Sequence, residues 1–255
     1  MTKQIEKVFF KIIIPNYNNM PYIKKCLDSI LEQTFQDFKI IIVDDLSTDL
    51  SDKFCEMYAR KYPNKIVYKQ LSKKGYAGAA RNYGLDYPIK SKYILFVDSD
   101  DWLYDVNVLK KIYDKIQCCN KNIKMIKMAM YHFYGNNNDK NYIHTFNNLT
   151  LKSSFYNGCG PGRTCISSEL SKCKFKENRR VANDVIWFLR CIDCINSNEL
   201  LNIQFPCETY NCISLTSGTN LIKKHKHSKE YFISMRLLLE DLKNEIFLSP
   251  LVKNI

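Results

Sequence analysis

The chain has 255 residues, of which 45% are hydrophobic and 25% charged, and these values exclude extensive disorder and allow one large or two small folded domains. The net charge of +12 suggests an anionic partner such as a nucleotide, a nucleic acid or an acidic membrane surface. Because the lysines are scattered along the chain, we interpret most of them as a solvated basic surface and expect no nucleic-acid partner.

The first ten residues lack the apolar run of a signal peptide, and no later window offers eighteen uncharged apolar residues. We therefore expect a cytoplasmic protein without a transmembrane segment, whose basic clusters would allow peripheral membrane contact. In that compartment the eleven cysteines stay reduced. Cys191 and Cys194 form one CxxC pair inside a helical pattern, without a second pair at zinc spacing, which favours core thiols over a metal site.

Strands and helices are predicted to alternate in the first part of the chain. Helices are expected after Pro21, after Thr48 or Asp49, and from Gly75. Apolar runs without polar alternation are typical of strands buried on both faces, as in a parallel sheet covered by helices. Four such strands are predicted, at residues 8–14, 38–43, 66–71 and 93–97.

The pattern is less regular after the fourth strand. Short strands and turns are expected from residue 200 to residue 219, followed by an amphipathic helix at 229–247. A Gly-Pro loop at 153–163 is a plausible substrate-facing segment. The other predicted elements are helices at 106–116, 167–173 and 181–195 and strands at 124–131 and 142–146, the last after a polar turn at 135–141.

Carboxylates directly follow two of the predicted strands. Asp44 and Asp45 follow the second strand, and Asp98, Ser99 and Asp100 follow the fourth. Ligands of parallel sheets bind just past the carboxyl ends of the strands, and clustered carboxylates repel one another unless a cation neutralises them. Because Mg²⁺ and Mn²⁺ favour hard oxygen ligands and bridge to phosphates, we interpret the DSD triplet as a metal and diphosphate site. The alternative is a solvated acidic turn that caps the next helix.

The stretch GYAGAARN, residues 75–82, opens a helix with small residues that let the backbone approach a neighbour or a ligand, while Arg81 supplies a cation. Its spacing differs from the dinucleotide-binding GxGxxG pattern, and the sequence contains no GxxxxGK[ST] loop. Both absences argue against a dehydrogenase or a P-loop enzyme.

The ordered motifs IIIPNYN, IIIVDDLSTD, GYAGAARNYG and YILFVDSDDW resemble those of the family 2 glycosyltransferases over roughly the first two fifths of the chain. Asn183-Asp184, followed by Trp187 and Arg190, is similar to the family's ED motif, with Asn where Glu is usual. The resemblance implies a GT-A fold, which is an α/β fold with a Rossmann-like, mostly parallel central sheet flanked by helices and with acceptor-side helices at the C-terminal end.

The resemblance also implies roles in donor binding. Pro15 and Tyr17 would lie beside the nucleotide base, and one acid of the Asp44-Asp45 pair would accept the imide N–H of uracil. Asp45 is our first choice for that acceptor. Arg81 would hold the nucleotide as a fixed cation whose planar guanidinium also donates hydrogen bonds.

The remaining implied roles concern the metal and the chemistry. Asp98 would bind ribose or metal, Ser99 would belong to the same donor site, and Asp100 would be the direct ligand of Mn²⁺ or Mg²⁺. Asp184 would be the general base that takes the proton of the acceptor hydroxyl in a single inverting displacement. Asp101 is expected to be a helix-proximal acid rather than a ligand.

We therefore predict a metal-dependent inverting hexosyl- or N-acetylhexosaminyl-transferase that moves a sugar from a UDP-sugar to a hydroxyl of a glycan, lipid or protein. One domain is expected, with a donor half at 8–103, a metal and acceptor half at 104–220, and a basic segment and helix at 221–255. The alternatives are a sugar-phosphate nucleotidyltransferase, whose Gly-rich loop after the first strand is missing, and a degenerate glycan-binding subunit. Trp102 could line the acceptor site or lie in the core. His225 and His227 are interpreted as part of an exposed basic segment.

Overall fold

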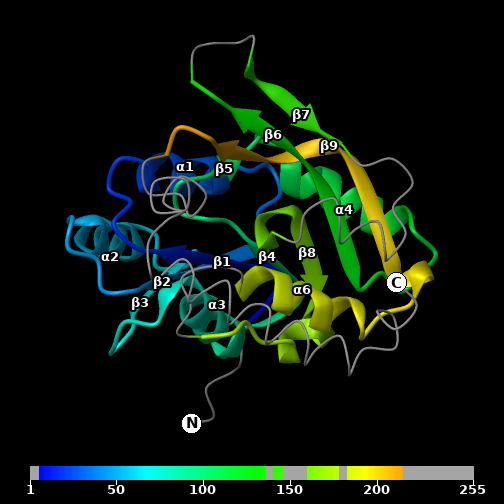
Figure 1. Ribbon diagram of the computed structural model, residues 1–255, viewed down its shortest axis with the longest axis horizontal. Helices are drawn as coiled ribbons and strands as arrows, with labels where there is room; N and C mark the ends of the chain where they lie inside the picture. The colour runs from blue at the N-terminus through cyan, green and yellow to red at the C-terminus, as the bar shows by residue number, and fades with distance from the viewer. Residues whose placement is uncertain (1–5, 136–139, 146–159, 178–182, 215–255) are drawn as a thin grey trace, which may run out of the picture.

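The architecture is built on one nine-stranded sheet with the order β3-β2-β1-β4-β8-β6-β9-β5, in which β7 pairs with β6 (Figure 1). The structure is a computed structural model, and it describes residues 6–135, 140–145, 160–177 and 183–214. The first part of the sheet is parallel, because β1 pairs with both β2 and β4, and β2 pairs with β3. These four strands are Lys7–Asn16 (β1), Phe38–Asp44 (β2), Ile66–Gln70 (β3) and Lys90–Phe96 (β4).

The second part of the sheet is mixed. β8 pairs antiparallel with β4 and β6, while β9 runs parallel to β6 and antiparallel to β5. The β6–β7 hairpin reaches away from the body of the molecule at the top of Figure 1. The strands are Trp102–Leu103 (β5), Met125–Phe133 (β6), Tyr142–His144 (β7), Thr164–Ser167 (β8) and Leu200–Asn211 (β9).

Helices cover both faces of the sheet. Side chains alternate across a strand, so Ile12 and Ile14 of β1 pack into one core while Ile13 packs into the other. The first core joins β1 to α1 (Ile23–Leu31), α2 (Ser51–Lys61) and α4 (Val108–Cys118). On the opposite face lie α3 (Tyr76–Asp86) and α6 (Asn183–Ile192), which Figure 1 shows below the sheet. Each fully buried isoleucine contributes roughly 1.5–3 kcal/mol.

Short 3₁₀ helices complete the described part of the fold: η2 (Pro161–Arg163), η3 (Ser168–Lys172) and η4 (Ser197–Glu199). No helix within the described residues is both long and apolar enough to cross a membrane.

The small residues of α3 allow close packing against the protein itself. A Cβ on Gly84 would lie 2.5 Å from a methyl carbon of the buried Ile13, and a Cβ on Gly78 would collide with the carbonyl oxygen of Lys176. The helix therefore needs glycine at both positions to sit this close to the sheet and to the following loop. The sequence allowed either a neighbouring segment or a ligand to lie close to these small residues, and neighbouring protein atoms account for both glycines.

The four predicted N-terminal strands and the helices between them are confirmed, with ends that differ by a few residues. One prediction is wrong: residues 200–211 form a single long strand, β9, instead of several short ones. The sequence suggested several short strands because Pro206 lies within this stretch. In the structure Pro206 lies where the register against β6 shifts. The strands β5 and β8 were not predicted, and the predicted helix at 229–247 lies outside the described residues.

Candidate active site

Asp44, at the carboxyl end of β2, is completely buried and saturated with hydrogen bonds. Asn16 donates its side-chain amide at 2.8 Å, and Ser47 donates both its backbone N–H at 2.9 Å and its hydroxyl at 2.5 Å. Gln70 adds a fourth donor at 3.2 Å. Since a carboxylate accepts about four hydrogen bonds, Asp44 has no capacity left for a ligand. It ties the ends of β1, β2 and β3 together.

Asp45 joins the end of β2 to the start of α3. Its carboxylate accepts the backbone N–H groups of Gly75 at 2.7 Å and of Tyr76 at 2.9 Å, and it pairs with the ammonium of Lys74 at 3.1 Å. Tyr76 has a φ of 62°, a left-handed conformation that is uncommon for a residue other than glycine. Asp45 therefore anchors a turn that an unbound backbone would rarely adopt.

Lys74 connects Asp45 to the aromatic ring that follows β1. Its ammonium lies 2.7 Å from the centre of the Tyr17 ring and donates to the backbone carbonyl of Asp45 at 2.8 Å. Tyr17 is 45% exposed, whereas Pro15 is buried within β1 and pairs with Val43. The structure thus brings together Tyr17 and Asp45, two of the predicted base-binding residues, with a lysine between them that the sequence analysis did not single out.

Arg81 and Asp98 form a short ion pair between α3 and the loop after β4. The guanidinium lies 2.6 Å from Asp98, with the arginine side chain 6% exposed and the aspartate side chain 37% exposed. The Nε of Arg81 is buried and makes no hydrogen bond in the described part of the chain. The pair fixes the direction of the Asp98 carboxylate and leaves one edge of it open to solvent.

Ser99 directly follows Asp98 and contacts the loop between β1 and α1. Its hydroxyl accepts a hydrogen bond from the side-chain amide of Asn19 at 2.5 Å, and it is buried. This contact holds the loop after β4 against the loop after β1. The proposed part of Ser99 in nucleotide binding stays a prediction.

The next two acids, Asp100 and Asp101, are buried and held by residues at the end of β9 and just after it. Ser214 donates its hydroxyl to Asp100 at 2.6 Å, and the backbone N–H of Asn211 donates to Asp101 at 2.8 Å. Burial, reinforced by the neighbouring charge of Asp98, raises the pKa of Asp100 to about 6. Burial and the charge of Asp100 likewise raise the pKa of Asp101 well above its ordinary value.

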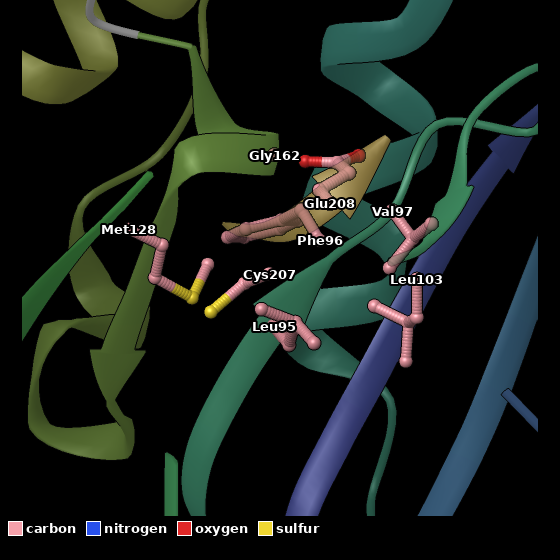
Figure 2. Close-up of a pocket in the computed structure, with 8 residues that line it drawn as sticks. All are labelled: Leu95, Phe96, Val97, Leu103, Met128, Gly162, Cys207 and Glu208. Atoms are coloured by element: carbon pink, nitrogen blue, oxygen red, sulfur yellow. The ribbon is translucent and has the colours of Figure 1, made fainter. Parts of the chain in front are cut away.

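Glu208 of β9 is a further buried acid that the sequence analysis missed. Neither of its carboxylate oxygens has a hydrogen-bond partner among the described residues, and burial together with the charge of Asp101 raises its pKa well above the ordinary range. Figure 2 shows its carboxylate directed towards Gly162, where a Cβ would collide with it. A narrow apolar space lies beside it, lined by Leu95, Phe96, Val97, Leu103, Met128 and Cys207. The sequence signal for it was weak: a single acid in a stretch of mixed apolar and polar residues.

The oxygen atoms of these acids are of the ligand type that a divalent cation prefers. Within the described residues, no group of three His, Cys, Asp or Glu side chains is arranged as a metal site. The donor chemistry nevertheless suits a hard cation, because Asp98 is partly open, Asp100 has a raised pKa, and both oxygens of Glu208 are unpartnered. A nearby positive charge would favour the ionised form of each. The donor chemistry of Asp98 and Asp100 therefore suits a cation, and their role as its ligands stays a prediction. His225 and His227 lie outside the described residues.

Asp184 lies in the first turn of α6, where one of its oxygens accepts the backbone N–H of Val185 at 3.0 Å. The adjacent Asn183 is buried against α3, and its amide lies 3.4 Å from the place of a Cβ on Gly78. The helix start therefore sits one turn from Arg81. No hydrogen bond or ion pair between described residues joins Asp184 to Arg81 or Asp98, so the structure places the predicted base near the donor residues without direct contact.

Trp102 is partly buried and belongs to β5. The ammonium of Lys25 lies 3.3 Å from its ring, and the ring of Phe133 meets it edge to face at 5.4 Å. Its two expected roles, in the core or beside the acceptor, stay predictions.

The family model described as glycosyl transferase family 2 matches residues 11–192. The chain belongs to this family. The glycosyltransferase GlyA of Streptococcus pneumoniae serotype 4 is 39% identical over 105 residues, which are 41% of this chain and 14% of that protein. The minor teichoic acid biosynthesis protein GgaB of Bacillus subtilis is 44% identical over 94 residues, 36% of this chain and 10% of that protein. The chain thus spans a small part of the length of these relatives.

Two solved structures show the same fold. TarS 1-349 of S. aureus, in complex with UDP-GlcNAc, has a TM-score of 0.74 at 22% identity, over 95% of this chain and 67% of that chain. The mannosyltransferase PcManGT of Pyrobaculum calidifontis, in complex with GDP-Man and Mn²⁺, has a TM-score of 0.60 at 14% identity, over 89% of this chain and 64% of that chain. The family and the GT-A fold predicted from the motifs are therefore confirmed.

Proposed function

We propose that this chain transfers a sugar from a UDP-sugar to a hydroxyl group of a glycan, lipid or protein, with the help of a divalent cation. One observation carries the proposal: an unbroken series of contacts runs along the carboxyl edge of the sheet. Tyr17 meets Lys74, Lys74 meets Asp45, Asp45 anchors α3, and Arg81 of α3 meets Asp98. The complexes of structures with the same fold, one with UDP-GlcNAc and one with GDP-Man and Mn²⁺, support a nucleotide-sugar donor, and the first of them supports UDP.

The base of the nucleotide would stack on Tyr17 and meet Asp45. The exposed ring offers a flat apolar face, and Asp45 lies next to it through Lys74. Asp45 suits the imide N–H better than Asp44, because the four donors around Asp44 already fill its acceptor sites.

Asp98 and Asp100 would hold the cation. When bound, Mn²⁺ or Mg²⁺ would offset the negative charge that develops on the departing diphosphate. Arg81 has a positioning role in this arrangement: its ion pair directs the Asp98 carboxylate, and its own charge favours an anionic nucleotide nearby.

Asp184 would take the proton of the acceptor. The acceptor oxygen attacks the anomeric carbon, the bond from that carbon to the diphosphate oxygen breaks, and the hydroxyl proton passes to the Asp184 carboxylate. One oxygen of Asp184 is engaged by Val185 N–H, so the other is the candidate proton acceptor. A single displacement inverts the anomeric configuration and requires no nucleophile from the protein.

The test is release of nucleoside diphosphate from a panel of nucleotide sugars, with Mn²⁺ and with a chelator. We expect slow, Mn²⁺-dependent hydrolysis of one UDP-sugar. Asp184→Asn should retain UDP binding, measured by thermal stabilisation, and lose turnover by about 10²–10⁴-fold. The surface variant Asp114→Asn on α4 is the matched control. Turnover of Asp184→Asn at the wild-type rate would show that Asp184 is not the base. Thermal stabilisation by UDP that is the same with and without Mn²⁺, and the same in Asp100→Ala, would refute the proposed cation site.

A further inference from the structure

Three cysteines gather where the end of η3 meets the end of α6, and we call them the thiol cluster: Cys173, Cys191 and Cys194. Cys173 directly follows η3, Cys191 lies in the last turn of α6, and Cys194 comes just after it. The sulfur atoms of Cys173 and Cys194 are 3.9 Å apart. Cys173 and Cys191 are buried, whereas Cys194 is exposed. The CxxC pair noticed in the sequence thus gains a third cysteine from the segment that precedes α6.

The thiol cluster is separate from Asp184, the proposed base. Asp184 occupies the first turn of α6 and Cys191 the last, and a helix of ten residues is about 15 Å long. None of the roles proposed for sugar transfer uses these thiols. Their proximity therefore calls for its own chemical explanation.

The two segments that carry the sulfurs are fastened together by further contacts. The guanidinium of Arg190 donates to the carbonyl oxygen of Lys174 at 2.9 Å, and the thiol of Cys173 lies 3.5 Å from the carbonyl oxygen of Arg190. These contacts flank the sulfur pair, so they keep Cys173 and Cys194 close in the folded chain.

The surroundings also favour a reactive sulfur. Hydrogen bonding with the Cys191 and Cys194 thiols, together with the nearby charges of Lys172 and Arg190, lowers the pKa of Cys173 to about 7 despite its burial. A substantial fraction of Cys173 is then thiolate at neutral pH, and the thiolate is the nucleophile in disulfide exchange.

We propose that Cys173 and Cys194 form a reversible disulfide by exchange with a small-molecule disulfide, RS–SR. The exposed Cys194 attacks one sulfur of RS–SR, forms a mixed disulfide and expels RS⁻. Cys173 then attacks the Cys194 sulfur, forms the internal S–S bond and expels the second RS⁻. The two cysteines lose two electrons and two protons, and RS–SR becomes two RSH.

The geometry selects this pair. An S–S bond is about 2.05 Å long, so the sulfurs must approach by about 2 Å, and Cys194 at the surface has room to rotate. Cys191 is fully buried inside α6 and is out of reach of a reagent in solution. The bond would tie η3 to the end of α6 and enclose the segment that contains Asp184.

The experiment exposes the folded, reduced chain to glutathione disulfide, blocks the remaining thiols by alkylation and maps the peptides by mass spectrometry without reduction. We expect a peptide that links Cys173 to Cys194, a mass loss of two hydrogen atoms, and reversal by dithiothreitol. Cys173→Ser should instead retain glutathione on Cys194 and form no internal bond. The exposed Cys118 gives the matched control, and Cys118→Ser should leave the link unchanged.

A second measurement protects the test against a variant that folds poorly. In the wild-type chain the link should form at least about tenfold faster in buffer than in urea, because the fold holds the two sulfurs together. A link between Cys191 and Cys194, glutathione that persists on wild-type Cys194, or equal rates in buffer and urea would each overturn the proposal.

Discussion

The ammonium nitrogen of Lys74 lies 2.7 Å from the centre of the Tyr17 ring and 3.1 Å from a carboxylate oxygen of Asp45. A cation over an aromatic face is attracted by the electrons of the ring, and the carboxylate adds a charge-assisted hydrogen bond. A nucleobase that stacks on Tyr17 would need the same face. The base and Lys74 would therefore compete for it.

This competition predicts that Lys74→Met binds uridine more tightly than the wild type. Removing a cation–π contact of about 0.5–2 kcal/mol corresponds to a gain of roughly 2–30-fold, measured by calorimetry. UDP should gain less, since a displaced Lys74 could approach the diphosphate. The exposed neighbour Lys73 supplies the control Lys73→Met. Weaker uridine binding by Lys74→Met would show that the lysine assists the base instead of competing with it.

The two adjacent acids after β2 should respond differently to the same change. Asp44→Asn places an NH₂ group among four donors, so we expect a loss of about 1–3 kcal/mol in the free energy of unfolding with little change in UDP affinity. Asp45→Asn should weaken UDP binding by about tenfold or more. Urea denaturation and UDP titration of both variants are the measurements. The reverse ranking of UDP affinities would assign the base to Asp44.

His132 on β6 should make the fold sensitive to mild acid. Its Nε2 accepts from Arg163 at 3.0 Å, and its ring stacks on Tyr142 at 4.5 Å. Burial, with the charge of Arg163, lowers the pKa of His132 to about 4. The folded state thus binds fewer protons than the unfolded state below pH about 6.5, so stability is full above that pH and falls as pH drops towards 4.

The loss should amount to roughly 2–3 kcal/mol, given about 1.36 kcal/mol for each pKa unit. His132→Gln retains an acceptor for Arg163 and does not titrate, so its unfolding free energy should decline less between pH 7 and pH 4.5. Carboxylates titrate in the same range in both proteins, and the difference between the two profiles isolates the histidine. Parallel profiles would contradict a neutral His132.

Gly84→Ala tests the close packing of α3 on the sheet. The added Cβ would lie 2.5 Å from a methyl carbon of Ile13, a fully buried residue, so we expect a loss of about 1–3 kcal/mol in the free energy of unfolding. Gly160→Ala is the matched control, because no atom lies within 4 Å of its added Cβ. Equal stability of the two variants would show that the helix shifts freely.

The parallel part of the sheet was predictable because β1, β2 and β4 contain unbroken apolar runs, at residues 12–14, 40–43 and 93–96, as burial on both faces requires. The strands β5 and β8 were not, since they have two and four residues and form only by pairing with distant strands. Pro206 concealed β9, because a proline normally ends a strand and here it coincides with a register shift.

The residues of the candidate site were also predictable only in part. Motif spacing pointed to Asp45, Arg81 and Asp98, and the structure joins them through α3. Lys74 was indistinguishable from the many scattered lysines, and its significance depends on the ring of Tyr17 beneath it. Glu208 lies 110 residues after Asp98 in the sequence, so only the folded sheet brings its burial and its lack of partners into view.

The hydrogen bonds that hold the buried acids reach across 110 residues from Asn211 to Asp101 and 114 residues from Ser214 to Asp100. A ribosome synthesises these acids long before their partners, so the nascent parallel strands can assemble while the acidic loop is still unsupported. Long sequence separation also slows such contacts, because closing a long loop has an entropic cost. The arrival of β9 would thus be the step of biosynthesis that gives the acidic loop its final shape.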